Sequence, residues 1–255
     1  MQVIVLGSGT SHGVPVPGCE CAVCRSANPK NKRFRASILL RLDGHNVLFD
    51  TTPDFRSQAI ANDIRAIDAV FFTHGHADHI YGLDDLRAYS QRQGRIPCFA
   101  GENTAATLRK AFEYIFVGRN EGGGIPQIEL RTLNGPVELF GRTIEPVEIL
   151  HGKRRIYGFR VGGVGYLTDC SGISPESMSR LGGLKLLIIT GLRWEPHATH
   201  FSIGQSLEVA KVLRPGRILF THICHRLEHE ATNAALPQGA ELAYDGMVVE
   251  VEDEP

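Results

Sequence analysis

The sequence of 255 residues lacks the features that direct a chain into or across a membrane. It has no apolar run near the roughly 20 residues that a membrane-spanning helix requires. Its opening, MQVIVLGSGT, has no basic leader, long apolar core or small-residue cleavage site, so it predicts a first strand and not a signal peptide. We therefore expect a cytoplasmic protein without membrane contact.

The sequence also lacks an excess of charge of either sign, since its formal net charge is -1 at pH 7. A chain with this balance exerts no general attraction on nucleic acid or on an anionic membrane. Two short basic runs, 30–35 (KNKRFR) and 153–155 (KRR), have a size that is usually solvated surface, and we assign them no function. We therefore expect no nucleic-acid partner.

What the sequence does have is the composition of an ordinary globular protein, with 42% hydrophobic residues, 22% charged residues and 28 glycines. The many glycines predict tight turns between short strands. A chain of this length can bury a substantial core, and no linker or internal repeat interrupts it. We expect residues 1–255 to form a single domain.

Short runs typical of β-strands recur along the chain, and stretches with helical length and spacing lie between them. The runs that predict strands are 2–6, 37–42, 46–49, 69–73, 143–150, 156–161, 164–168, 184–190 and 217–220. The stretches that predict helices are 55–62, 83–92, 104–112, 175–181 and 203–213. Because consecutive strands are mixed with strand–helix alternation, the order predicts an α/β fold of mixed sheets covered by helices on their outer faces.

The segment HGHADH directly follows the strand-like run that ends at residue 73. It places the imidazoles of His74, His76 and His79 and the carboxylate of Asp78 within six residues. Closely spaced imidazole and carboxylate groups at a strand end can converge on transition metals, whereas a solvated loop rarely collects them in this order. The segment therefore predicts a metal centre.

The pattern His-x-His-x-Asp-His after an apolar strand resembles the signature of the metallo-β-lactamase superfamily. The resemblance implies a four-layer αββα sandwich of two mixed β-sheets, with two metals at one end of the strands. Three later residues match the family's ligand order, namely His151 after a strand, Asp169 in YLTD and His222 in LFTH. By this resemblance His74, His76 and His151 hold one metal, Asp78, His79 and His222 hold the other, and Asp169 bridges them.

A two-metal site predicts a hydrolase, because two cations about 3.5 to 4 Å apart lower the pKa of a bridging water and neutralise charge on the substrate. Asp78 and Asp169 are therefore candidate catalytic residues as well as ligands. Histidine and carboxylate ligands suit zinc, manganese and iron alike, so they do not fix the identity of the metals. Ala77 stands where flavo-di-iron relatives usually carry Glu, which disfavours an oxygen-reducing site.

Asp50 ends the strand-like run 46–49 and matches an acidic residue of the same family. One interpretation is that its carboxylate orients a metal ligand. The other is that it caps a helix before Pro53. The sequence leaves both open.

Cys19, Cys21 and Cys24 place three thiols within six residues near the N-terminus. In a reducing compartment, clustered thiols favour metal over disulfides. Three thiolates and one imidazole make a closed structural zinc site, so residues 19–24 predict a zinc clip with a fourth ligand from elsewhere in the chain.

The opening 7–15 (GSGTSHGVP) with these cysteines resembles the superfamily branch that contains cyclic-phosphate phosphodiesterases of phosphonate breakdown. Members of that branch carry such a zinc clip, and the resemblance implies His225 as its fourth ligand. Cys224, His12 and His229 remain alternatives.

His200, in the segment HATHFS, matches the family histidine that protonates the leaving oxygen. A histidine with a pKa near neutrality suits proton donation. His197 could fill the same role, and His200 could instead contact a substrate phosphate or start a helix.

Taken together, the resemblances imply a two-metal phosphodiesterase for small cyclic phosphodiesters such as ribose or nucleoside cyclic phosphates. A homodimer would agree with the resemblance, although no sequence feature identifies its interface. Two alternatives stay open. The same metals would also hydrolyse a thioester or lactone, and a binding module of this fold would keep the zinc clip without turnover.

Overall fold

The computed structural model describes residues 1–117 and 124–252, and their strands form two seven-stranded sheets. In sheet order, the first sheet contains β14 (Val248–Glu250), β1 (Gln2–Gly7), β2 (Ser37–Leu42), β3 (His45–Phe49), β4 (Ala69–Phe72), β5 (Ile96–Ala100) and β6 (Ile128–Thr132). The second contains β13 (Ala240–Leu242), β12 (Arg217–Thr221), β11 (Leu186–Thr190), β10 (Val164–Leu167), β9 (Arg154–Val161), β8 (Arg142–His151) and β7 (Val137–Leu139). Each sheet is mixed, with parallel pairing from β3 to β6 and from β10 to β13.

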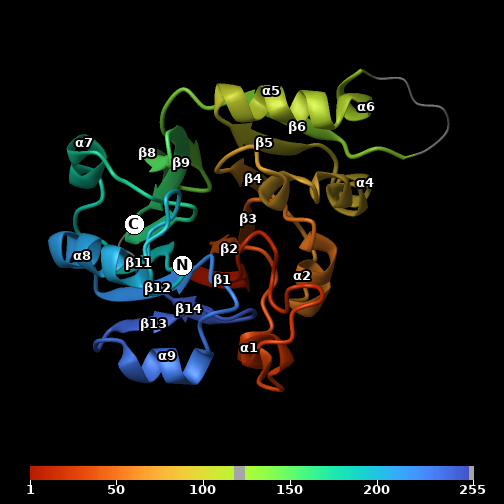
Figure 1. Ribbon diagram of the computed structural model, residues 1–255. Coiled ribbons are helices and arrows are strands. Elements are labelled where there is room, and N and C mark those ends of the chain that lie inside the picture. The colour runs from red at the N-terminus through yellow and green to blue at the C-terminus, as the bar shows by residue number, and fades with distance from the viewer. Residues whose placement is uncertain (118–123, 253–255) are drawn as a thin grey trace.

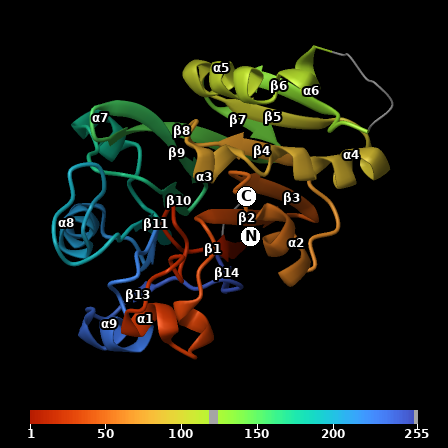
Figure 2. The same ribbon diagram turned by 45° about the vertical axis from the view of Figure 1, so that its right-hand side comes forward.

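Helices cover the outer faces of the two sheets (Figures 1 and 2), with α2, α4 and α5 on one side and α7 and α8 on the other. The helices are α1 (Ala22–Arg25), α2 (Phe55–Ala61), α3 (Ala77–Ile80), α4 (Arg87–Gln93), α5 (Glu102–Ala111), α6 (Glu113–Phe116), α7 (Pro175–Ser179), α8 (Ile203–Leu213) and α9 (His229–Ala235). Two 3₁₀ turns, η1 (Pro29–Asn31) and η2 (Leu83–Leu86), complete the described elements. Within this part of the chain, no helix is long and apolar enough to cross a membrane.

The strands build these layers because their side chains alternate between two apolar environments. On β4, Phe71 packs into the core between the sheets, whereas Val70 and Phe72 pack beneath the helices of the first sheet. On β11, Ile188 faces the central core and Leu187 faces the helices of the second sheet. Strands covered on both faces are hydrophobic throughout. The four-layer αββα sandwich predicted from the sequence is confirmed.

Three polar residues at the carboxyl ends of strands have a left-handed backbone conformation. Asp50 follows β3, Asp169 lies beyond β10 and His222 follows β12, with φ angles of 66°, 58° and 57°. A positive φ is costly for residues other than glycine and persists where surrounding contacts hold it. This strain marks one end of the two sheets as the place to look for a functional site.

A buried arginine joins the N-terminal and C-terminal segments beside the second sheet. The guanidinium of Arg33 donates to Oγ of Ser8 over 2.8 Å, to the carbonyl oxygen of Ala243, and to Nδ1 of His229 over 3.1 Å. A guanidinium can only donate, so Nδ1 of His229 must accept and the imidazole is neutral. Burial, with Arg33 next in importance, lowers the pKa of His229 to about 4 from 6.5.

The free energy of unfolding should therefore fall at acid pH, because His229 becomes protonated. Because the folded pKa lies below the unfolded value, the contribution is complete above about pH 6.5 and is lost as the pH falls towards 4, with about 2 kcal/mol lost by pH 5. Urea unfolding at pH 7.5 and pH 5 measures this effect. Between these two pH values, the free energy of unfolding should fall less for His229→Gln than for the unsubstituted chain. His12→Gln, which replaces an exposed histidine, is the control and should behave like the unsubstituted chain. An equal fall in His229→Gln and in the unsubstituted chain would show that His229 does not contribute.

Candidate metal centre

Side chains of metal-ligand type from both sheets converge at the strained end of the strands. One group contains His74, His76 and His151, and a second contains Asp78, His79, Asp169 and His222. Within each group the ligand atoms lie within 4.8 Å of one another. The structure thus brings together the seven residues that the resemblance indicated, divided in the same way.

Asp169 belongs to the second group and also lies close to the first. Its Oδ1 is 3.2 Å from Nε2 of His79, and its Oδ2 is 3.2 Å from Nε2 of His222. The same Oδ2 lies 3.9 Å from Nε2 of His74 in the other group. This carboxylate is therefore placed to contact metals in both groups.

Each ligand takes its position from the end of a strand or from the short helix α3. His151 is the last residue of β8, and His76 precedes α3, whose first turn carries Asp78 and His79. Nδ1 of His151 faces the carbonyl oxygens of Asp169 and Thr199, at 3.0 and 2.8 Å. These contacts fix the orientation of the ring and leave Nε2 of His151 for the cluster.

Asp50 orients one histidine from each group. Its Oδ2 lies 2.7 Å from Nδ1 of His79 and accepts a hydrogen bond of 2.8 Å from Oγ1 of Thr73, which itself lies 3.0 Å from Nδ1 of His74. The residue at the start of α2 is Asp54, so Asp50 is not the helix cap. Of the two interpretations left open by the sequence, the geometry supports the orienting carboxylate.

Replacing Asp50 by asparagine should therefore weaken both groups at once. The amide tolerates a positive φ but sets an N–H donor against donors at Thr73 or His79. Loss of such a supporting contact typically costs about 10- to 100-fold in metal affinity or activity. Hydrolytic activity and metal content per chain are the measurements, with Asp68→Asn, outside the cluster, as control. Unchanged values for Asp50→Asn would contradict this role.

The buried carboxylates and imidazoles of the cluster set one another's charge. Burial would raise the pKa of Asp169, but His222 and His79 outweigh it and hold that pKa well below its usual range. Burial alone lowers the pKa of His79, but Asp169, Asp50 and Asp78 outweigh it and raise that pKa well above its ordinary value. The three carboxylates thus stabilise a proton on the buried imidazole of His79. A bound metal cation would supply the same positive charge in place of that proton.

The donor atoms of the cluster also fit metals. Among the described residues, Nε2 of His79 and both ring nitrogens of His222 are buried and form no hydrogen bond of regular geometry, although both Nε2 atoms lie 3.2 Å from the carboxylate of Asp169. Buried polar atoms are rarely left unpaired, and metal ligation would satisfy them. Imidazoles with carboxylates suit zinc, manganese or iron. The residues present therefore fit a pair of divalent metals.

Comparison with known proteins decides the family. The model of the beta-lactamase superfamily domain matches residues 45–223. The chain belongs to the metallo-β-lactamase superfamily. A diphosphatase from the PhnP family, known from its crystal structure, matches with a TM-score of 0.92 and 45% identity, over 99% of this chain and 98% of that one. This metallo-β-lactamase-fold chain is therefore a metal-dependent hydrolase.

Two further relatives differ more from this chain, one in sequence identity and the other in length. Zn²⁺-bound PqqB from Methylobacterium extorquens matches with a TM-score of 0.81 over 98% of this chain and 100% of that chain, but at 20% identity it supports the fold alone. An octanoyltransferase from Porphyromonas gingivalis (strain ATCC BAA-308 / W83) is 37% identical over 97% of this chain. The chain spans about half of that relative, 51% of its length.

Next to this metallo-β-lactamase centre, His200 contacts the cluster and His197 lies outside it. Nε2 of His200 is 3.3 Å from Oδ2 of Asp169, and its ring centroid lies 4.7 and 4.6 Å from those of His151 and His222. His197 is exposed, with its Nδ1 3.2 Å from Nδ1 of His200 on the side away from Asp169. Of the two candidates, His200 is the one placed to reach a bound substrate.

The cysteine cluster forms at a distance in sequence from its histidine. Nδ1 of His225 lies 3.2, 3.5 and 3.6 Å from the sulfur atoms of Cys19, Cys21 and Cys24. A hydrogen bond from the backbone N–H of Cys24 is the main cause that lowers the pKa of Cys21 to about 6, whereas burial raises that of Cys24 to about 11. Three thiols and one imidazole fit a closed tetrahedral zinc site.

The histidine in this cluster is the one that the resemblance implied. His225 follows β12 and lies three residues beyond His222, so one loop carries a member of the cysteine cluster and a member of the metal centre. Cys224, His12 and His229 do not join the four-residue group in the described structure.

One group of residues at the centre belongs to no motif in the sequence. The basic run 153–155 was assigned no function, yet Nη1 of Arg154 lies 2.7 Å from Nε2 of His76. The available signal was position. The run begins two residues after His151, in the turn of the hairpin that pairs His151 with Arg154, so its side chains had to lie beside the cluster.

Proposed function

We propose that this metallo-β-lactamase superfamily member is a two-metal phosphodiesterase acting on small cyclic phosphodiesters, such as ribose or nucleoside cyclic phosphates. The observation that carries the proposal is the position of Asp169, whose carboxylate touches both ligand groups and also His200. The similarity to a diphosphatase of 45% identity supports phosphoryl chemistry over carbonyl chemistry.

In this proposal His74, His76 and His151 hold one metal, Asp78, His79 and His222 hold the other, and Asp169 bridges them. When bound, the metals would supply hydroxide at neutral pH and neutralise charge on the phosphoryl oxygens. Asp50, through His79 and Thr73, holds ligands of both groups in place. The cysteine cluster with His225 would hold a third metal, a structural zinc.

His200 is proposed as the general acid, because Nε2 is the ring nitrogen that faces Asp169 and the cluster. Nδ1 of His200 lies 2.8 Å from Oγ1 of Thr199, which positions the ring. A proton carried on Nε2 can pass to the departing oxygen of the substrate. Burial lowers the pKa of His200, which makes its protonated form a stronger acid.

The effect of His200→Gln should depend on the leaving group. An alkoxide needs a proton as it departs, whereas p-nitrophenolate is stable without one, and general acids typically contribute about 100- to 10,000-fold. We expect kcat for a 2′,3′-cyclic nucleotide to fall by at least about 100-fold, and kcat for bis(p-nitrophenyl) phosphate to fall far less. His197→Gln serves as the matched control. Equal losses on both substrates would contradict the acid role.

The proposed function is tested with metal-reconstituted protein and four substrates: bis(p-nitrophenyl) phosphate, a 2′,3′-cyclic nucleotide, a thioester and a lactone. Turnover of the phosphodiesters alone supports the proposal. Turnover of the thioester or lactone with inert phosphodiesters would contradict it.

Acyl-group hydrolysis is the second candidate, because the same metals polarise carbonyl and phosphoryl groups alike. The octanoyltransferase relative favours it, although that activity is stated for a protein twice as long. Cys170 is not the nucleophile of a covalent acyl transfer. The thiol of Cys170, next to Asp169, is buried, and burial raises its pKa to about 12, so it is not a thiolate nucleophile at neutral pH.

A non-catalytic binding module is the third candidate, and it would show no turnover with both metals bound. The complete set of seven ligand-type residues speaks against it. A small phosphodiester substrate without a nucleic-acid partner, a cytoplasmic location and a homodimer remain part of the proposal.

A further inference from the structure

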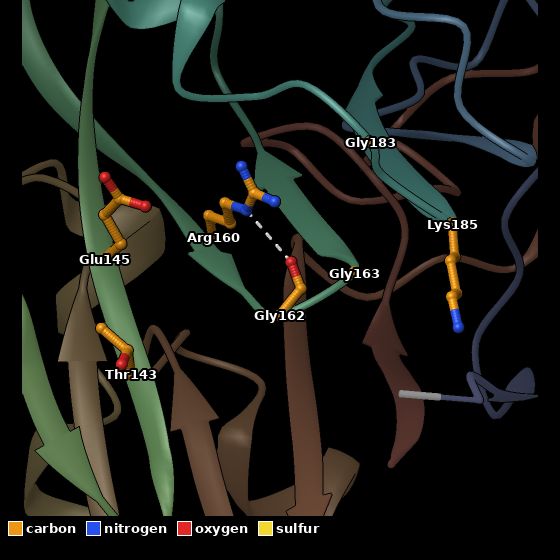
Figure 3. Close-up of a pocket in the computed structure, with 7 residues that line it drawn as sticks. All are labelled: Thr143, Glu145, Arg160, Gly162, Gly163, Gly183 and Lys185. Carbon is orange, nitrogen blue, oxygen red and sulfur yellow. Dashed lines mark hydrogen bonds between the residues drawn. The ribbon is translucent and has the colours of Figure 1, made fainter. Parts of the chain in front are cut away.

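Two pockets away from the metal centre are lined by polar side chains that already have partners or reach solvent. In the pocket at the hairpin between β9 and β10 (Figure 3), Arg160 donates to the carbonyl oxygen of Gly162, and Lys185 donates to the carbonyl oxygen of Glu252. The pocket between α2 and α4 is lined by four arginines and three aspartates. Among the described residues that line these pockets, none has a buried side-chain polar atom without a hydrogen bond.

A buried hydroxyl near the metal centre differs from them. The side chain of Tyr166 on β10 is 1% exposed, and its OH forms no hydrogen bond of regular geometry. Within the described ranges 1–117 and 124–252, the other such atoms belong to Arg33, His79, Thr221 and His222. The histidines are candidate metal ligands, Thr221 directly precedes one of them, and the other nitrogens of Arg33 have acceptors. The hydroxyl of Tyr166 has no such explanation.

Packing accounts for the ring of Tyr166 but not for its hydroxyl. The ring lies in the core between the two sheets and meets the ring of Phe49 edge-on, with 6.0 Å between centroids. Phenylalanine would make the same contacts, whereas a buried hydroxyl without a partner destabilises the fold. A hydroxyl kept at such a place needs a role outside the packing of the core.

The hydroxyl of Tyr166 lies near the charged groups of the metal centre. Burial is the main cause that raises the pKa of Tyr166 well above its ordinary value, and the negative charges of Asp50 and Asp169 add to it. A contact with Thr168 acts in the opposite direction. Tyr166 therefore keeps its proton at neutral pH, so it can donate a hydrogen bond there and cannot act as a base.

Thr168 connects Tyr166 to the carboxylate of Asp169. It lies two residues after Tyr166, so the two side chains leave the extended backbone towards the same face. Oγ1 of Thr168 donates to Oδ1 of Asp169 over 2.8 Å. A hydroxyl has a single hydrogen, so Oγ1 of Thr168 has only acceptor positions left. The phenol of Tyr166, which touches Thr168, is the donor that fits one of them.

We propose that Tyr166 is a positioning residue of the metal centre: its hydroxyl donates to Oγ1 of Thr168, which donates to the carboxylate of Asp169. This inference rests on metal binding by Asp169, which is part of the proposed function. A carboxylate that ligates metals keeps its orientation through such hydrogen bonds. Two hydroxyls in sequence also polarise each other, which strengthens the bond that reaches Asp169.

Tyr166→Phe tests this role, because it removes the hydroxyl and keeps the ring. In protein that retains only the clip zinc, its urea midpoint should equal or exceed that of the unsubstituted chain, since no unpaired hydroxyl remains. The affinity of the active site for Zn²⁺, measured by competition with a chelator, should fall at least about tenfold. The visible spectrum of Co²⁺ at the active site should change, and kcat should fall with little change in KM.

Tyr89→Phe is the matched control and should show the opposite pattern. Tyr89 on α4 is also buried, but its OH donates to the carbonyl oxygen of Ile64 over 3.1 Å, beneath the helices of the first sheet. Its removal should lower the urea midpoint, because the carbonyl loses a hydrogen bond. The affinity for Zn²⁺ and the spectrum of Co²⁺ should stay as in the unsubstituted chain.

A double-substitution cycle tests the path through Thr168. Thr168→Val keeps the branched shape without the hydroxyl, so adding Tyr166→Phe to it should cause no further loss of Zn²⁺ affinity. Thr168→Ser, which keeps the hydroxyl, should bind Zn²⁺ like the unsubstituted chain. Independent losses from Thr168→Val and Tyr166→Phe that simply add would overturn this path.

The outcomes separate the positioning role from the proposed function. Unchanged Zn²⁺ affinity and an unchanged Co²⁺ spectrum in Tyr166→Phe would overturn the role of Tyr166 and leave the phosphodiesterase standing. The expected losses of affinity in a protein that hydrolyses no phosphodiester would support the role of Tyr166 and contradict the phosphodiesterase. Failure of the unsubstituted protein to bind active-site metals would overturn both.

Discussion

Asp169→Ala is expected to lower kcat/KM for phosphodiesters by at least about 1,000-fold and to reduce the metal content of the active site. The side chain contacts members of both ligand groups, at 3.2 Å from His79, 3.2 Å from His222 and 3.9 Å from His74. Its removal would take one ligand from each metal and leave the buried imidazole of His222 without its nearest carboxylate. Kinetics and metal analysis on the same preparation measure both effects.

The control for Asp169→Ala is Asp63→Ala, which removes an exposed carboxylate paired with Arg65 outside the metal centre. We expect its activity and metal content to equal those of the unsubstituted chain. If Asp169→Ala retained two active-site metals and most of its activity, the bridging position of Asp169 would be wrong, and the two groups would have to bind metals independently.

Cys19→Ser is expected to give the largest loss of stability among the substitutions considered. The sulfur of Cys19 lies 3.2 Å from Nδ1 of His225, the shortest of the three thiol contacts. A structural zinc contributes directly to folding free energy, and loss of a ligand from a closed site should cost about 3 kcal/mol or more. For a chain of this size that corresponds to a fall in Tm of roughly 6 to 12 °C.

The effect of Cys19→Ser should reach the active site as well. His225 and His222 share one loop after β12, so loosening the cysteine cluster should also displace a ligand of the metal centre. Cys224→Ser is the matched control, because Cys224 lies beside His225 but outside the four-residue cluster. One zinc lost per chain and a lower Tm in Cys19→Ser alone would agree with the prediction. Equal behaviour of the two variants would rule out a zinc clip at Cys19.

The strands that sequence periodicity predicted are those with strong hydrophobic patterns, and all of them are found. The runs 37–42 and 203–213 match β2 and α8 at both ends. The stretch 83–92 is helical, but it divides into η2 and α4. In each case the local sequence carries the apolar spacing that burial requires.

The missed strands lie towards the edges of the sheets or carry a weak pattern. β7, β13 and β14 have three residues each, and β6 exposes Glu129 and Arg131, so their sequences carry little apolar signal. β5 contains Pro97, which argues against a strand when the sequence is considered alone. Pairing with neighbouring strands, which no local pattern shows, sets these elements in place.

The candidate site was largely predictable because its ligands sit in a fixed order at strand ends. His74, His76 and His151 gather as the family resemblance implied, and the structure places His225 with the cysteines. The role of Arg154 was not predictable. Its contact with His76 joins residues 78 positions apart, and a short basic run has the same composition on a solvated surface as in a pocket.

The central claim, that two metals joined by Asp169 hydrolyse a phosphodiester, is tested most directly by titrating metal into protein whose active site has been stripped while the clip zinc is retained. Hydrolysis of bis(p-nitrophenyl) phosphate is followed against metal bound per chain. We predict that activity rises until two metals are bound in addition to the clip zinc, and that Asp169→Ala stays inactive throughout. Full activity with one active-site metal, or no phosphodiester hydrolysis with two, would contradict the claim.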